Sequence, residues 1–249
     1  MALPVSGPGE PDGPHRFHTT RWSIVVAAGE GVTPEGRAAL ETLCRACWFP
    51  LYAFARRGGD GPEEAADLVQ GFFAELLEKG YLRQADRERG RFRTFLLAAF
   101  RHHASKEREK ARAQKRGGGV ATMSLDFAYG ESRYLAEPVD DRTPERIYER
   151  RWALSLLDRV LEELRASYGE GERGVVFDAL RPLLVGGGPA TSLGEIGTRI
   201  GMSEGAAKVA LHRMRRRYRD LLRAAIAETV ADPAEVDDEI RHLLEALAG

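Results

Sequence analysis

The chain has 249 residues, of which 43% are hydrophobic and 30% charged, and its 37 Lys and Arg nearly balance its 38 Asp and Glu. This length and apolar content suffice for two small packed domains. No apolar run is long enough to cross a bilayer, and the N-terminus lacks the basic and apolar pattern of a secretion signal. We therefore expect a cytoplasmic protein without a membrane partner.

The nearly neutral total conceals three charged blocks. Residues 101–116 hold seven Lys or Arg and two Glu, and residues 199–223 hold eight basic and two acidic residues. Residues 228–249 have the opposite character, with seven acidic residues and one Arg. Positive charge concentrated in two blocks of a neutral chain favours local contacts with a polyanion.

The first half of the chain predicts a tail followed by a helical domain. Residues 1–17 are rich in Pro and Gly, which is typical of a disordered tail. A helical domain is expected over residues 18–116, because apolar residues recur there at helical spacing. Its helices are expected near Thr20, from Thr33-Pro34 towards Arg57 with a kink at Pro50, from Asp60 to Lys79, and from Arg91 to about Arg116.

The two cysteines, Cys44 and Cys47, fall within the apolar pattern of the second expected helix. This position favours buried structural thiols over a redox or metal role. No second Cys pair and no suitably spaced His pair completes a zinc site. We therefore expect neither a metal nor a cofactor.

The second half predicts a linker and a second helical domain. Residues 117–142 are rich in Gly and aperiodic, as in an interdomain linker. Thr143-Pro144 then opens a helical domain over residues 143–227, with a further helix from Glu172 to Leu184. No stretch alternates convincingly as a strand. The expected fold class is all-α, with two small helical domains joined by a flexible linker.

Residues 192–222 predict two helices separated by a tight turn. Ser192 and Glu195 have the spacing of a capping box, and Gly201 is suited to the left-handed residue that ends a helix. Ser203 then caps a second helix with one apolar face and several basic faces. This is the helix-turn-helix arrangement, in which the second helix enters the major groove of DNA.

Residues 228–249 predict a separate acidic helix, from Asp232-Pro233 to about Leu247. Its apolar residues form a stripe, and its opposite face is acidic. We expect it to fold back onto a basic or apolar surface and to restrain the protein; a solvated or partner-binding tail is the alternative. The stripe consists of Val236, Ile240, Leu243, Leu244 and Leu247.

Two blocks resemble a known family. The first is ADLVQGFFAELLEKG at residues 66–80, followed by ERGRFRTFLLAAFRHHA at residues 88–104, and the second is SLGEIGTRIGMSEGAAKVALHRMRRRYRDLL at residues 192–222. In this order they are similar to regions two and four of bacterial RNA polymerase sigma factors of the extracytoplasmic-function type. The resemblance extends over about residues 18–226 and includes the motif TRWS that begins at Thr20.

The resemblance implies a non-enzymatic subunit that binds core RNA polymerase and directs it to promoter DNA. The polymerase contacts that it implies are Asp67, Leu68, Gln70 and Phe73. The contacts that it implies around the minus-ten element are Arg83, Arg89, Arg91, Arg93 and Phe95, and those with the adjacent duplex are Arg101, His102, Lys106, Arg108, Lys110 and Arg112. Those implied for the minus-thirty-five element are Lys208, Val209, His212, Arg213, Arg216 and Arg217.

One departure from the family pattern concerns the second helix of residues 192–222. Relatives commonly present small polar and basic residues where this chain has Val209 and Ala210. Apolar side chains contact thymine methyl groups but form no hydrogen bonds with base edges. We therefore expect weak base reading by this helix, with more of the sequence choice made by Gly80 to Arg116.

Two other functions are compatible with parts of the sequence. A transcription regulator that uses only the helix-turn-helix would leave the block between Asp60 and Arg116 unexplained. A nuclease with His102 and His103 at a metal would need nearby acids, which here alternate with Lys and Arg and make a poor metal site. The sequence also leaves open whether an anti-sigma protein or the C-terminal helix itself restrains the chain.

Overall fold

The computed structural model describes residues 33–79, 91–113, 125–136, 142–184, 192–230 and 232–248. These residues form nine α-helices, one short 3-10 helix and no strand, which confirms the all-α class for this part of the chain. No helix among them is long and apolar enough to span a bilayer. The expected tail, the helix near Thr20, Arg83 and Arg89 lie outside the described residues.

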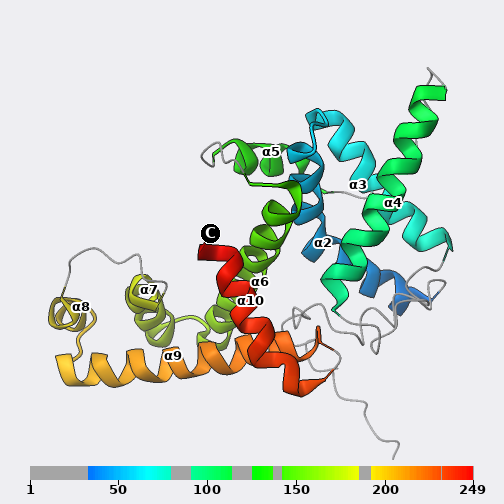
Figure 1. Cartoon of the computed structure of the whole chain (residues 1–249). Coiled ribbons are helices and arrows are strands. Elements are labelled where there is room, and N and C mark those ends of the chain that lie inside the picture. The colour runs from blue at the N-terminus through cyan, green and yellow to red at the C-terminus, as the bar shows by residue number, and fades with distance from the viewer. Residues whose placement is uncertain are drawn as a thin grey trace, which may run out of the picture.

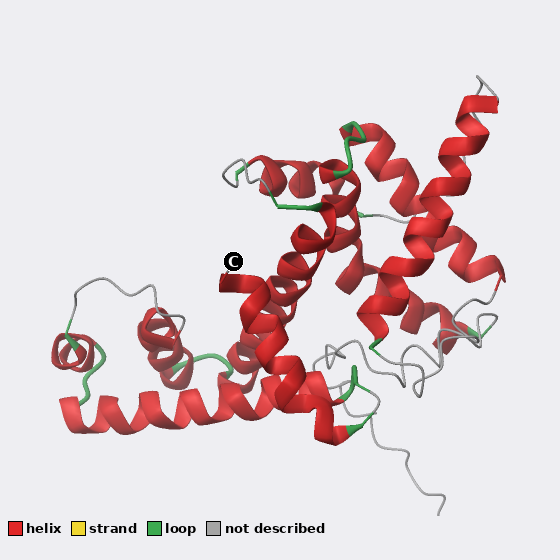
Figure 2. Cartoon of the chain, in the orientation of Figure 1, coloured by secondary structure: helices red, strands yellow, loops and turns green. Residues whose placement is uncertain are grey.

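The helices begin and end close to the expected residues (Figures 1 and 2). Local signals account for the starts: the Thr143 side chain, for example, accepts a hydrogen bond from the backbone of Arg146, with Pro144 at the first helical position. The elements are α2 (Pro34–Arg57), α3 (Pro62–Lys79), α4 (Phe92–Ala113), α5 (Phe127–Leu135), α6 (Pro144–Tyr168), α7 (Glu172–Leu184), α8 (Leu193–Arg199), α9 (Glu204–Ala227), η3 (Pro233–Glu235) and α10 (Val236–Ala248).

Residues 117–142, which the sequence predicts as a linker, contain helix α5, which the sequence did not predict. The Asp126 side chain caps this nine-residue helix by accepting a hydrogen bond from the backbone of Tyr129. The Glu131 carboxylate accepts two hydrogen bonds from the Arg56 guanidinium on α2, both at 2.9 Å. These bonds hold the pKa of Glu131 below its usual value although partial burial opposes them. The segment is therefore anchored to α2.

Most of the large apolar side chains form a first cluster around α2. Tyr52 and Phe72 are almost fully buried there, together with Phe100 of α4 and Tyr148 of α6. Cys44 and Cys47 have no exposed surface, and burial raises the pKa of the Cys44 thiol. The expected buried position of both thiols is confirmed.

A second apolar cluster joins the end of α6 to α7, α8 and the first part of α9. Its buried residues are Leu164, Phe177, Leu180, Ile196, Leu211 and Met214. Helices α6 and α9 run through both clusters, since Trp152 of α6 and Ile226 of α9 belong to the first. The structure thus has two apolar clusters bridged by two long helices, while the division into two domains stays a prediction.

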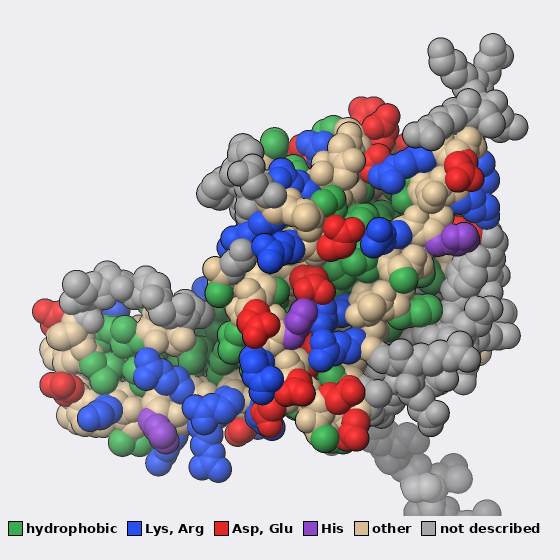
Figure 3. All heavy atoms as spheres, in the orientation of Figure 1, with side chains coloured by type: hydrophobic (Ala, Val, Ile, Leu, Met, Phe, Trp, Pro, Cys, Tyr) green, Lys and Arg blue, Asp and Glu red, His purple; other side chains and the backbone are tan. Residues whose placement is uncertain are grey.

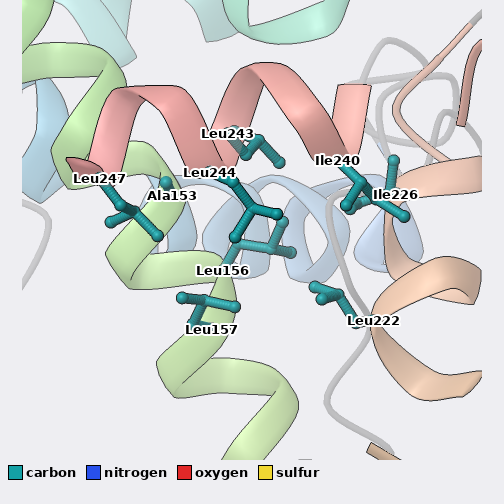
Figure 4. A pocket seen from close by; sticks show the side chains of 9 residues that line it. All are labelled: Ala153, Leu156, Leu157, Leu222, Ile226, Ile240, Leu243, Leu244 and Leu247. Atoms are coloured by element: carbon teal, nitrogen blue, oxygen red, sulfur yellow. The ribbon is translucent and has the colours of Figure 1, made fainter. Parts of the chain in front are cut away.

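Helix α10 packs against α6 and α9 (Figure 1). Val236 and Leu243 of its stripe are buried, whereas Leu244 remains 55% exposed. The predicted return of this helix to the body of the protein is confirmed. A small apolar hollow remains where the three helices meet (Figure 4), lined by Ala153, Leu156, Leu157, Leu222, Ile226, Ile240, Leu243, Leu244 and Leu247.

Candidate nucleic-acid interface

Helices α8 and α9 are the two helices that the sequence predicts over residues 192–222, with a short turn between them. Both halves of the capping box are present: the Glu195 backbone donates to the Ser192 hydroxyl at 3.2 Å, and the Ser192 backbone donates to the Glu195 carboxylate at 2.9 Å. Gly201 has a φ of 70°, as expected for the left-handed residue. The Ser203 hydroxyl caps α9 by accepting from the backbone of Ala206 at 3.2 Å.

Gly197 lets α8 approach the turn before α9 very closely. Its carbonyl accepts a hydrogen bond from the backbone of Met202 at 2.8 Å. A Cβ at Gly197 would lie 2.8 Å from the Met202 carbonyl oxygen, a backbone atom that has no side-chain freedom to move away. The orientation of α9 relative to α8 therefore depends on this glycine.

The substitution Gly197→Ala should lower the free energy of unfolding by about 1–3 kcal/mol, because it forces a backbone shift in a packed turn. Urea unfolding followed by helix circular dichroism measures the change. The matched control is Gly205→Ala, which meets nothing within 4 Å and replaces a helical glycine. It should raise the same free energy by up to about 1 kcal/mol. Equal effects of the two substitutions would contradict the close approach at Gly197.

The outer surface of α9 carries exposed positive charge. Its inner residues Ala207, Leu211 and Met214 are buried, and basic side chains cover the outside (Figure 3). Lys208, His212, Arg213, Arg216 and Arg217 are all exposed, and none of them forms a salt bridge with another described residue.

Like charges three and four residues apart on a helix repel one another, as at Arg213, Arg216 and Arg217. An anionic partner would relieve this repulsion. The two apolar positions differ from each other: Val209 is 49% exposed, whereas Ala210 packs against the second cluster. Only Val209 therefore offers an apolar contact to a base.

The second half of α4 is also basic and exposed, but acids neutralise much of its charge. The guanidinium of Arg108 lies 2.6 Å from the Asp60 carboxylate, and the Lys110 ammonium lies 2.6 Å from Glu107. Arg101 and Lys106 have longer pairs, at 3.4 Å with Glu145 and 3.5 Å with Glu75. His102 is exposed, and the side chain of Arg112 lies outside the described set.

His103 is buried, as expected for a core histidine, and it forms a short hydrogen bond with Glu75. The two histidines of the alternative nuclease hypothesis differ in burial, because His103 is buried while His102 is exposed. In the part of the chain that the structure describes, no three His, Cys, Asp or Glu side chains gather as metal ligands.

The start of α4 differs most from the expected DNA surface. The Arg93 side chain is only 4% exposed and pairs with Glu239 of α10 and Glu149 of α6, each at 2.8 Å. Burial alone would lower the pKa of Arg93, but these two carboxylates outweigh burial and raise it. Arg93, for which the resemblance implies a DNA contact, is therefore buried between α10 and α6, and its DNA contact stays a prediction. Arg91 is partly exposed, and Phe95 is partly buried beside Phe92.

The expected polymerase contacts on α3 fall on two faces. Asp67 is exposed, and Leu68 and Gln70 are partly exposed. Phe73 has no exposed surface and belongs to the first apolar cluster, so the polymerase contact that the resemblance implies for it stays a prediction without an exposed side chain to make it. The cause is the wide apolar face of α3, which places Phe72 and Phe73 in the core together.

Comparison with known protein families, with curated proteins and with solved structures finds no match to this chain.

Proposed function

We propose that the chain is a sigma factor of the extracytoplasmic-function type, which binds core RNA polymerase and directs transcription initiation at promoter DNA. The observation that supports this best is the exposed basic face of α9, on which Lys208, Arg213, Arg216 and Arg217 form no salt bridge with another described residue, and which packs against α8. Phosphate contacts of such a face supply affinity, and few base contacts are available beyond Val209. Such a protein acts in the cytoplasm and catalyses no reaction of its own.

In this proposal, α2, α3 and α4 correspond to region two and the helices from α6 to α9 correspond to region four. The exposed Asp67 on α3 would contact polymerase, and the basic second half of α4 would contact duplex DNA. The likeness of residues 66–104 and 192–222 to the two family blocks supports this assignment.

A helix-turn-helix regulator without a polymerase role is the second candidate. It is favoured by the burial of Phe73 and Arg93, two residues to which the sigma proposal gives surface contacts. Under this alternative, α9 alone would bind DNA, and the helices of the first cluster would serve as a scaffold.

Reconstituted transcription distinguishes the two. The purified chain is mixed with bacterial core polymerase and a library of promoter fragments, and transcripts that depend on the chain are sequenced. A sigma factor yields such transcripts and coelutes with core polymerase. DNA binding without coelution and without transcripts would contradict the sigma proposal and favour the regulator.

A matched pair of variants locates the polymerase contact. We expect Asp67→Arg to weaken coelution, because it reverses the charge of the exposed face of α3. Glu162→Arg makes the same charge change at an exposed position of α6 instead of α3 and should leave coelution unchanged. DNA affinity, measured separately, should be the same for both variants.

A further inference from the structure

A single buried carboxylate ties the C-terminal helix to the start of α4. The side chain of Glu239 on α10 is 3% exposed and accepts hydrogen bonds from Arg93, from Nε at 2.8 Å and from Nη2 at 3.2 Å. The Nε of Arg91 lies 2.9 Å from the same carboxylate. The guanidiniums of Arg91 and Arg93, at the start of α4, thus both bind an acid near the other end of the chain.

A second acid extends this cluster to α6. The Glu149 carboxylate accepts from Arg93 Nη1 at 2.8 Å and lies 2.7 Å from the Nε2 of His242, which is on α10. The backbone takes part as well, because the Tyr148 hydroxyl donates to the Arg93 carbonyl at 2.9 Å. The same residues thus connect α4, α6 and α10.

The apolar anchoring of α10 is modest by comparison. Val236 and Leu243 are buried, but Leu244 is largely exposed and Leu247 is only partly covered. Near its start, Asp237 pairs with Arg223 on the surface, and the acidic side of α10 faces solvent (Figure 3). The ion pairs of Glu239 with two arginines therefore contribute much of what holds α10 in its docked position.

We propose that α10 is an intramolecular latch, in which Glu239 occupies the place that a backbone phosphate of DNA would take on Arg91 and Arg93. This inference rests on the proposed function, which assigns both arginines to promoter DNA. A guanidinium forms the same paired hydrogen bonds with a carboxylate as with a phosphate, so the two anions exclude each other. DNA binding at the start of α4 then requires the release of Glu239, and the chain is restrained until α10 leaves.

The buried ion pair of α10 is with α4 and not with the basic helix α9. Among the described residues, the acidic helix pairs with a basic residue of α9 at Arg223, on the surface, whereas its buried acid meets α4. The restraint therefore acts on the start of α4 and leaves Arg213, Arg216 and Arg217 exposed. Contact between α9 and DNA remains possible while the latch is closed.

The substitution Glu239→Gln tests the latch, because it removes the charge and retains the shape of the side chain. The probe is a forked DNA of mixed sequence, with a duplex arm and a single-stranded arm, titrated at constant salt. The closed state is expected to be favoured about a hundredfold or more, and release then raises the apparent affinity by about the same factor. The neighbouring Asp238→Asn makes the same charge change on a side chain that is 65% exposed, and it should bind as the unaltered chain does. Equal affinities of Glu239→Gln and Asp238→Asn would overturn the latch.

The unaltered chain provides a second test that does not depend on the folding of a variant. Hydrogen–deuterium exchange of residues 236–248 should rise when the forked DNA is bound. Binding with unchanged protection of these residues would overturn the latch. Reconstituted transcription is read separately: its failure would contradict the sigma role, whereas the affinity and exchange measurements would still decide whether α10 competes with DNA.

Discussion

Replacement of Lys208, Arg213, Arg216 and Arg217 by Ala together should lower the affinity of the chain for duplex DNA about a thousandfold at about 0.1 M salt. Each cation that contacts a phosphate releases a counterion, so the slope of log K against log salt should fall by about 3 to 4. All four side chains are exposed, and Ala favours the helix, so the fold should be retained. Fluorescence anisotropy at several salt concentrations measures both the affinity and the slope.

The matched control removes four exposed arginines from other helices: Arg45, Arg146, Arg173 and Arg241. It changes the net charge of the chain by the same amount, so any effect of overall charge appears in both variants. We expect the control to keep most of the affinity and nearly all of the salt slope. A control that loses as much slope as the α9 variant would show that DNA does not select the face of α9.

The substitution Arg93→Ala should lower the free energy of unfolding by about 3–5 kcal/mol, because it leaves the buried Glu239 and the half-buried Glu149 without their main cationic partner. Urea unfolding at neutral pH measures this loss. The control is Arg101→Ala on the same helix, whose pair with Glu145 is exposed and 3.4 Å long. An exposed pair contributes at most about 1 kcal/mol.

A second variant separates lost charge pairing from lost volume. Arg93→Met combined with Glu239→Leu replaces the buried pair by apolar groups of similar size, and buried pairs replaced in this way often lose little stability. The double variant should therefore be more stable than Arg93→Ala by about 2 kcal/mol or more. If Arg93→Ala costs no more than Arg101→Ala, the ion-pair cluster does not hold α10 in place.

Helix boundaries were predictable where the signal is local. Thr143, Ser192 and Ser203 each cap a helix through their own side chain, and the sequence around them is sufficient to place it. Helix α5 was missed because nine residues without a clear apolar repeat give little periodicity. Its position depends on Arg56, far away in the sequence, which binds Glu131.

The residues of the candidate interface were likewise predictable where the signal is local, and not where burial depends on a distant residue. The exposed basic face of α9 follows from helical spacing, because its apolar residues define which side is buried. The burial of Arg93 does not follow from spacing, because it depends on Glu239 near the other end of the chain. One sequence signal for this contact exists. Glu239 is next to Ile240 and one turn before Leu243, so it lies beside the apolar stripe of α10. An acid that is buried there needs a cationic or hydrogen-bonding partner.

Helix α9 is one uninterrupted helix of 24 residues, and at 1.5 Å per residue it is about 36 Å long. Its exposed arginines lie between Arg213 and Arg223, while Ala225 and Ile226 at its far end are embedded in the first cluster. The chain then continues directly to Thr229, whose carbonyl accepts a hydrogen bond from the backbone of Phe92 at 3.4 Å. Because α9 is uninterrupted, its exposed arginines and the residues that follow it belong to one continuous stretch of chain. The segment that follows the basic helix therefore contacts the first residue of α4 directly.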